Sequence, residues 1–151
     1  MLKYLIKLLA ILLLMSACGF SPMYSSKNSK LYNIKILNLE GDNKINSIIK
    51  QRLKNHKNIN AELHDISINT IFEKTDLTKN MAGKTVSYQI KATSIVNVTK
   101  GKFNKIIKIT RDFETQNFED KFEERSYENR LKEDIAQYMY EKIILEISKT
   151  L

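Results

Sequence analysis

The sequence of 151 residues contains no tryptophan, one cysteine, one proline and two histidines. A single cysteine excludes an internal disulfide and any metal site built from several thiolates. His56 and His64 lack the spacing of a zinc pair and have no cysteine to complete one. We therefore expect no bound metal.

Sequence motifs for catalysis and for cofactor binding are also missing. There is no Gly-x-Ser-x-Gly turn and no glycine-rich phosphate loop. Asp42, Asp65, Glu73 and Asp76 form neither an EF-hand nor a carboxylate pair. The sequence predicts a protein that is not an enzyme and has no cofactor. A deep pocket with convergent polar groups would revive the alternative of a periplasmic enzyme.

The first 17 residues have the layout of a targeting segment. Lys3 and Lys7 form a positive start, Leu8 to Met15 is wholly apolar, and Ser16 and Ala17 are the small residues that a signal peptidase requires. The apolar run is too short for a spanning helix, which needs about 20 residues. We expect residues 1–17 to be a cleaved signal peptide.

Cys18 follows this segment directly. It could be a buried thiol, a reactive nucleophile or a modified residue, and its position after a targeting segment favours modification. The run Met15-Ser16-Ala17-Cys18 resembles the lipobox of bacterial lipoproteins, although most members have leucine at the Met15 position. The resemblance implies acyl chains on Cys18, and two or more chains anchor a protein stably. The alternative is an ordinary cleaved signal peptide with a leftover cysteine.

The residue after the cysteine and the charge balance limit the location and the partners. Gly19, rather than Asp, is typical of Gram-negative lipoproteins sorted to the outer membrane, with the body on the periplasmic side. The net charge is +8, and loss of the two signal-peptide lysines leaves +6. Nucleic acid is an unexpected partner there, whereas acidic headgroups or phosphorylated glycolipids are suitable ones. Part of the charge could instead reflect a sequence rich in Lys, Asn and Ile throughout.

The remaining chain divides into a tether and one domain. Residues 18–30 include the polar, turn-rich stretch Ser21 to Lys30 and predict a flexible tether. The length of 31–151 suits a single domain. Alternating apolar residues predict a strand over 32–40, with either Ile36 or Leu37 facing inward. Isoleucines and a leucine at spacings of three and four predict a helix over 43–55.

Three strand patterns and a long helix follow. The strands are expected over 62–73, 86–99 and 103–118. From about Tyr127, apolar residues recur every four positions and predict a helix. They are Leu131, Ile135, Met139, Ile143, Ile147 and Leu151. The order β-α-β-β-β-α predicts an α+β two-layer sandwich, with two helices packed on one face of a four-stranded sheet.

The stretch "CGFSPMY", Cys18 to Tyr24, resembles the opening of the alphaproteobacterial LPS-assembly lipoproteins, the LptE family, with Met23 in place of their usual leucine. The predicted element order is also similar to that family's fold. The resemblance implies a non-catalytic outer-membrane lipoprotein that plugs the LptD β-barrel, helps it to assemble, and contacts lipopolysaccharide on its way to the surface. The alternative is an auxiliary lipoprotein of an ABC-type lipid transport system.

Four cationic residues are candidates for lipopolysaccharide binding, since lysine and arginine recognise phosphate. Lys74, Lys79 and Lys84 lie in a segment predicted to be a loop between two strands, so they are expected to cluster at one end of the sheet. Arg111 is expected near the end of the strand predicted over 103–118, on its apolar face and partly buried. The alternative is that these are ordinary solvated side chains.

The anchor provides the first testable prediction. Cys18→Ser should block processing by the lipoprotein signal peptidase and leave a longer precursor on an immunoblot. The intact mass of the wild-type mature protein should include a diacylglycerol and an N-acyl chain on Cys18. An unmodified mature N-terminus would contradict the lipoprotein interpretation.

Overall fold

The computed structural model describes residues 32–55 and 61–149. The predicted signal peptide, Cys18 and the tether lie outside the described residues, as do His56 and Leu151. Leu31–Leu151 forms one compact unit. Its elements are β1 (Asn33–Gly41), α2 (Asn43–Asn55), β2 (Leu63–Lys79), β3 (Thr85–Lys100), β4 (Phe103–Gln116) and α3 (Lys121–Ser148). The predicted order β-α-β-β-β-α is confirmed.

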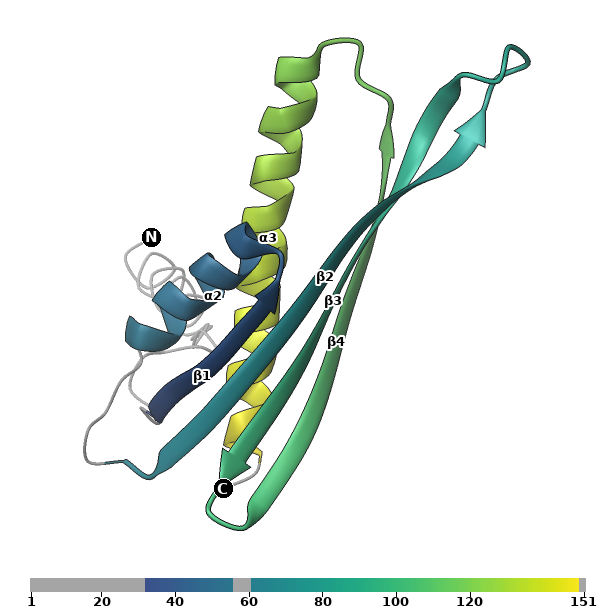
Figure 1. Ribbon diagram of the computed structural model, residues 1–151. Coiled ribbons are helices and arrows are strands. Elements are labelled where there is room, and N and C mark those ends of the chain that lie inside the picture. The colour runs from purple at the N-terminus through teal and green to yellow at the C-terminus, as the bar shows by residue number, and fades with distance from the viewer. Residues whose placement is uncertain (1–31, 56–60, 150–151) are drawn as a thin grey trace, which may run out of the picture. The chain divides into compact units, whose positions relative to one another are not determined.

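The four strands form one mixed sheet in the order β1-β2-β3-β4. β1 and β2 are parallel because α2 connects them as a crossover, whereas β2, β3 and β4 are joined by tight turns and run antiparallel. Both helices lie on the same face of the sheet (Figure 1). The prediction of a two-layer α+β fold is therefore confirmed, and neither of the two described helices covers the opposite face of the sheet.

The corner between β1 and α2 is held against β2. The amide of Asp42 donates to the carbonyl oxygen of Thr70 at 2.8 Å. Gly41 has φ +90°, and a Cβ there would lie 1.9 Å from the same Thr70 oxygen. Only glycine fits this close approach. The carboxylate of Asp42 then caps α2, because its Oδ1 accepts from the amide of Ile45 at 2.9 Å.

α3 begins at Lys121, six residues before the predicted start near Tyr127. Asp120 is its N-cap, and Oδ1 of that residue accepts from the amides of Phe122 and Glu123. This Asp-x-x-Glu pattern is a helix-start signature that the apolar spacing alone did not reveal. The early turns are polar because they extend past the core. In residues 32–55 and 61–149, neither helix has the length and apolar content of a membrane span.

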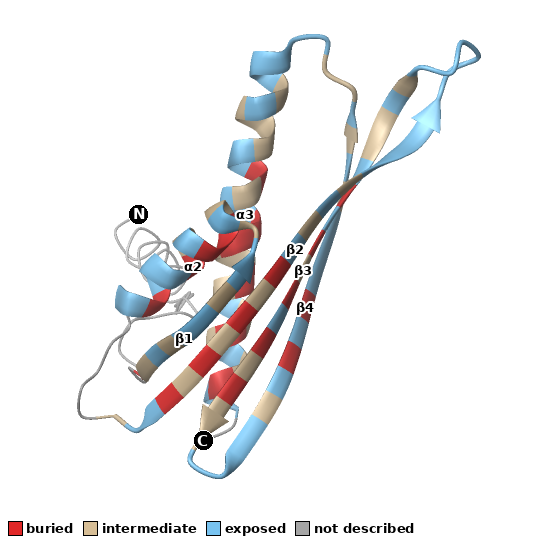
Figure 2. Ribbon diagram, in the orientation of Figure 1, coloured by how far each residue is buried: buried red, intermediate tan, exposed pale blue. Residues whose placement is uncertain are grey.

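The core lies between the sheet and the two helices, and the buried residues of α3 recur every four positions (Figure 2). The predicted stripe is confirmed for the five of its residues that the structure describes. They are Leu131, Ile135, Met139, Ile143 and Ile147. The core also contains a polar pair, because the Thr70 and Ser94 hydroxyls lie 2.6 Å apart and the Ser94 hydroxyl reaches the sulfur of Met139. Each hydroxyl therefore has a partner inside the protein.

Two strands differ from their sequence patterns. A register shift in β1 between Ile36 and Asn38 turns Leu37 outward, so Ile36 rather than Leu37 faces inward. The prediction that the segment before β3 is a loop is wrong for most of its length, because β2 continues to Lys79. Thr78 pairs with Ser87, and their hydroxyls lie 2.6 Å apart. Pairing with β3 keeps this polar stretch extended although it has no apolar alternation.

The β1–α2 corner gives a prediction with a matched control. Gly41→Ala combines an unfavourable positive φ with a backbone collision, so it should destabilise the protein by about 3 kcal/mol or more. Gly83→Ala has a similar φ, +75°, but nothing within 4 Å of the added Cβ. Gly83→Ala should therefore lower the free energy of unfolding by only about 1–2 kcal/mol. Urea unfolding measures both, and equal losses would show that contact with Thr70 is unimportant.

Candidate functional site

The β2–β3 hairpin extends beyond the core and carries two of the candidate lysines at its far end (Figure 1). Asn80 closes the turn, because its side-chain oxygen accepts from the amides of Ala82 and Lys84 at 3.0 Å each. The Asn80 amide donates to the carbonyl of Lys84 at 2.9 Å. The turn is therefore well ordered by hydrogen bonds and presents Met81 and Lys84 to solvent.

Lys74 lies on the helix-facing side of β2 and is tied to α3. Its ammonium contacts Oε1 of Glu124 at 2.5 Å and lies 4.4 Å from the ring centre of Tyr88. Lys121 holds the other carboxylate oxygen at 2.6 Å. The two ammonium groups, with Lys121 contributing most, lower the pKa of Glu124 to about 2. The ion pair between Lys74 and Glu124 therefore connects the hairpin to the first turns of α3.

The structure does not gather the three lysines into one pocket. Lys79 pairs with Asp76 at 3.0 Å, and the exposed Lys84 makes no ion pair among the described residues. Lys74 and Lys79 are five residues apart on one strand, which is about 16 Å. The expected clustering therefore holds only in the sense that all three lie toward the same end of the sheet.

Arg111 lies on the helix-facing side of β4, as expected, but it is exposed rather than partly buried. Its guanidinium is 4.3 Å from the ring centre of Tyr138 on α3 and 5.3 Å from that of Phe113. Lys142 approaches the Tyr138 ring as well, at 5.4 Å. Two cations thus share one aromatic ring between β4 and α3.

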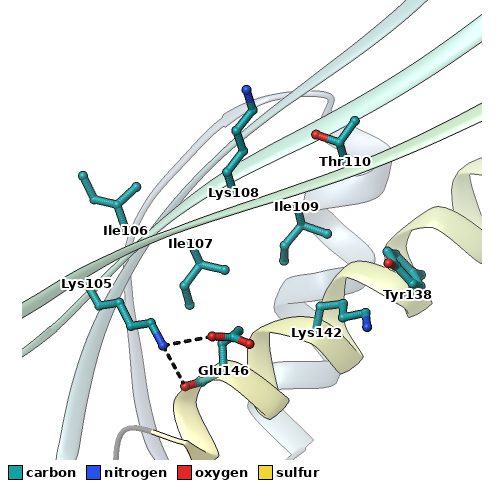
Figure 3. Close-up of a pocket in the computed structure, with 9 residues that line it drawn as sticks. All are labelled: Lys105, Ile106, Ile107, Lys108, Ile109, Thr110, Tyr138, Lys142 and Glu146. Atoms are coloured by element: carbon teal, nitrogen blue, oxygen red, sulfur yellow. Dashed lines mark hydrogen bonds and ion pairs between the residues drawn. The ribbon is translucent and has the colours of Figure 1, made fainter.

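A groove of about 470 Å³ lies beside these cations, between β4 and α3 (Figure 3). One wall is a continuous run of β4 from Lys105 to Thr110. The other wall is a row of α3 residues spaced four apart, Tyr138, Lys142 and Glu146. Ile107 and Ile109 point toward the helix and form an apolar floor.

The charges of the groove are mainly positive. Glu146 accepts from Lys149 at 2.5 Å and from Lys105 at 2.9 Å, and these two ammonium groups lower its pKa to about 2. Its charge is therefore already balanced. Lys108 and Lys142 have no carboxylate partner among the described residues. The groove can hold an anionic group above an apolar floor.

The histidine that the structure describes has a packing role. His64 is buried, its ring meets that of Tyr32 edge-on, and its Nδ1 lies 2.9 Å from the carbonyl oxygen of Glu62. In residues 32–55 and 61–149, no three His, Cys, Asp or Glu side chains are placed to hold a metal.

Sequence reasoning missed the groove and the residues that define it, namely Lys105, Lys108, Lys142 and Glu146. Lys105 and Glu146 are far apart in the chain, and only the packing of α3 across β4 brings them together. Glu124 was missed as the partner of Lys74 for the same reason. The Asp-x-x-Glu start of α3 could have placed Glu124 in the first helical turn, but nothing in the sequence pairs it with β2.

Neither a protein-family model nor a curated protein sequence matches the chain. Solved structures do. The crystal structure of rare lipoprotein B from Shewanella oneidensis superposes with a TM-score of 0.59 at 14% identity, over 77% of this chain and 96% of that one. The solution structure of a lipoprotein B from Nitrosomonas europaea superposes with a TM-score of 0.49 at 13% identity, over 78% of this chain and 88% of that one. The first likeness shows that this chain has the fold of a bacterial lipoprotein, rare lipoprotein B.

The Glu124 contacts give a pH prediction. The lowered pKa of Glu124 means that its contribution to stability is present above about pH 4.5 and is lost as the pH falls toward 2. Glu124→Gln should lower the free energy of unfolding by up to about 1 kcal/mol at pH 7 and by almost nothing at pH 2. The effect at pH 7 is small because Lys121 is exposed. Glu123→Gln removes a carboxylate from the same turn and is the control. Urea unfolding at several pH values measures both; a loss independent of pH would contradict the ion-pair role.

Proposed function

We propose that this chain is an outer-membrane lipoprotein of the LptE family, of the alphaproteobacterial type, that plugs the LptD barrel, helps it to assemble, and contacts lipopolysaccharide in transit. Rare lipoprotein B is another name for LptE. The observation that carries the proposal is the shared fold, which extends over nearly the whole of the Shewanella structure. The opening "CGFSPMY" supports it independently, because that resemblance rests on sequence and not on the fold.

The lipid anchor follows from the proposed processing at Cys18. Acyl chains there would hold the tether at the inner leaflet of the outer membrane, and the domain from residue 31 would lie on the periplasmic side. A protein fixed in this way can reach only partners in or near the same membrane. That restriction favours an outer-membrane barrel as the partner.

The open face of the sheet offers a contact surface for such a barrel. Neither helix covers it (Figure 1), and its strands carry mostly Ser, Thr, Asn, Gln and Lys. Ile71, Ile95 and Ile106 are exposed and lie on a diagonal across β2, β3 and β4, because each is displaced by two residues from the next in the strand register. A polar surface with a few apolar contacts suits the water-filled lumen of a barrel.

Co-purification from detergent-solubilised membranes tests the partner. The tagged full-length protein should recover LptD, identified by mass spectrometry, whereas recovery of transporter subunits would support the ABC-type alternative instead.

Ile135→Asp places an unpaired carboxylate at a fully buried position, at a cost of several kcal/mol. It should reduce correctly assembled barrel and sensitise cells to large hydrophobic antibiotics. The exposed variant Lys50→Glu should do neither; normal assembly with unfolded Ile135→Asp protein would refute the assembly role.

Lipopolysaccharide binding is best tested at the hairpin tip, where two candidate lysines can be removed without disturbing Glu124. Lys79→Ala with Lys84→Ala should weaken binding about 2- to 10-fold, and added salt should weaken it further. Lys50→Ala with Lys54→Ala removes the same charge from exposed positions on α2. Equal losses in the two double variants, measured on immobilised lipopolysaccharide, would show that the tip is not a specific contact.

A further inference from the structure

The groove beside β4 has a lining that identifies what kind of surface it is. Side chains of a strand alternate between the two faces of a sheet, so a hollow on one face contacts every second residue. This groove is lined by every residue of β4 from Lys105 to Thr110. Figure 3 shows Ile107 and Ile109 on the helix side and Ile106 and Lys108 on the other. The groove therefore runs along the edge of the strand.

That edge is available for hydrogen bonding. β4 is the last strand of the sheet, and no other strand among the described residues pairs with its outer side. In an antiparallel pair, alternate residues direct their N–H and C=O groups away from the partner strand. β4 consequently presents a row of backbone donors and acceptors along the groove, and an exposed row of this kind is a template for another strand.

The charges beside the edge select the occupant. Lys108 extends on the open face of the sheet, and Lys142 extends from α3 on the helix side. Neither has a carboxylate partner among the described residues, while the one carboxylate in the lining, Glu146, is held by Lys105 and Lys149. Each face of an added strand would thus meet a cation that has no carboxylate partner among the described residues. Carboxylates on either side of such a strand would be stabilised.

We propose that the free edge of β4, with α3 as its second wall, is a docking site for an extended acidic segment of a partner protein, which adds to the sheet as a fifth strand. Main-chain hydrogen bonds to β4 supply the affinity, and the groove and the two lysines select the side chains, as in other cases of strand addition. Side chains that point to the helix side meet Tyr138 and Lys142, and those that point to the open face meet Ile106 and Lys108. The site does not depend on the identity of the barrel partner.

Hydrogen exchange resolved to single residues tests this on the full-length lipidated protein in detergent micelles. The probe is a short blocked peptide of alternating glutamate and valine at millimolar concentration, and its counterpart has lysine for glutamate. The acidic peptide should slow exchange of alternate amides between Lys105 and Thr110 by about tenfold when it is present at roughly ten times its Kd. Amides of β1, the opposite edge strand, should not change.

Charge-reversed variants distinguish strand addition at this edge from nonspecific adsorption of the peptide. Lys108→Glu with Lys142→Glu should abolish the slowing, and Lys50→Glu with Lys54→Glu, on α2, should leave it intact; circular dichroism confirms that both remain folded. Three results would overturn the proposal. They are no slowing by the acidic peptide, equal slowing by the lysine peptide, or slowing by lipopolysaccharide micelles alone. The first would mean that the edge lysines only discourage aggregation, the second that the peptide binds without selection by charge, and the third that the groove is a lipid site.

Discussion

The close contact between the β1–α2 corner and β2 is the constraint on which the rest of the fold depends. Gly41 passes so near the Thr70 carbonyl that no side chain fits, and the amide of Asp42 is bonded to that same oxygen. The Asp42 carboxylate caps α2 and also binds Lys132 of α3 at 2.8 Å. Burial by itself raises the pKa of Asp42, but the bonds from Ile45 and Lys132 outweigh it and the pKa is lowered. One residue thus joins β2, α2 and α3, and fixes where the helices lie on the sheet.

With both described helices fixed on one face, the remaining surfaces of the sheet differ from one another in polarity and charge. The face opposite the helices is polar with a diagonal of three isoleucines, and the hairpin carries its cations away from the core. Among residues 32–55 and 61–149, no strand pairs with the outer edge of β4, and α3 packs against the face of that strand (Figure 3). Because both described helices lie on the same side, the described domain has three distinct surfaces beside its core, namely the open face, the hairpin tip and the edge of β4.

Much of the fold was predictable because its signals are local. Apolar spacing located α2 to the residue and identified the buried stripe of α3, since a helix repeats every 3.6 residues wherever it packs. The strand patterns located β1, β3 and β4 closely. They failed for the end of β2, because the stretch from Lys74 to Lys79 is polar except for the exposed Leu77 and remains extended through pairing with β3. They also passed over Thr70 and Ser94 as core residues, because a buried hydroxyl needs a hydrogen-bond partner, and here that partner lies on the neighbouring strand.

The sequence alone determined the order of the elements, the α+β class, the absence of a disulfide, and the lipobox-like run ending at Cys18, because each depends on neighbouring residues or on composition. It named Lys74, Lys79, Lys84 and Arg111 as candidates, but could not say which of them already had partners. Only the tertiary structure paired Lys74 with Glu124, placed Arg111 over Tyr138, and formed the groove from Lys105 to Glu146. Those contacts join residues far apart in the chain, and their distances are set by how α3 packs across the sheet.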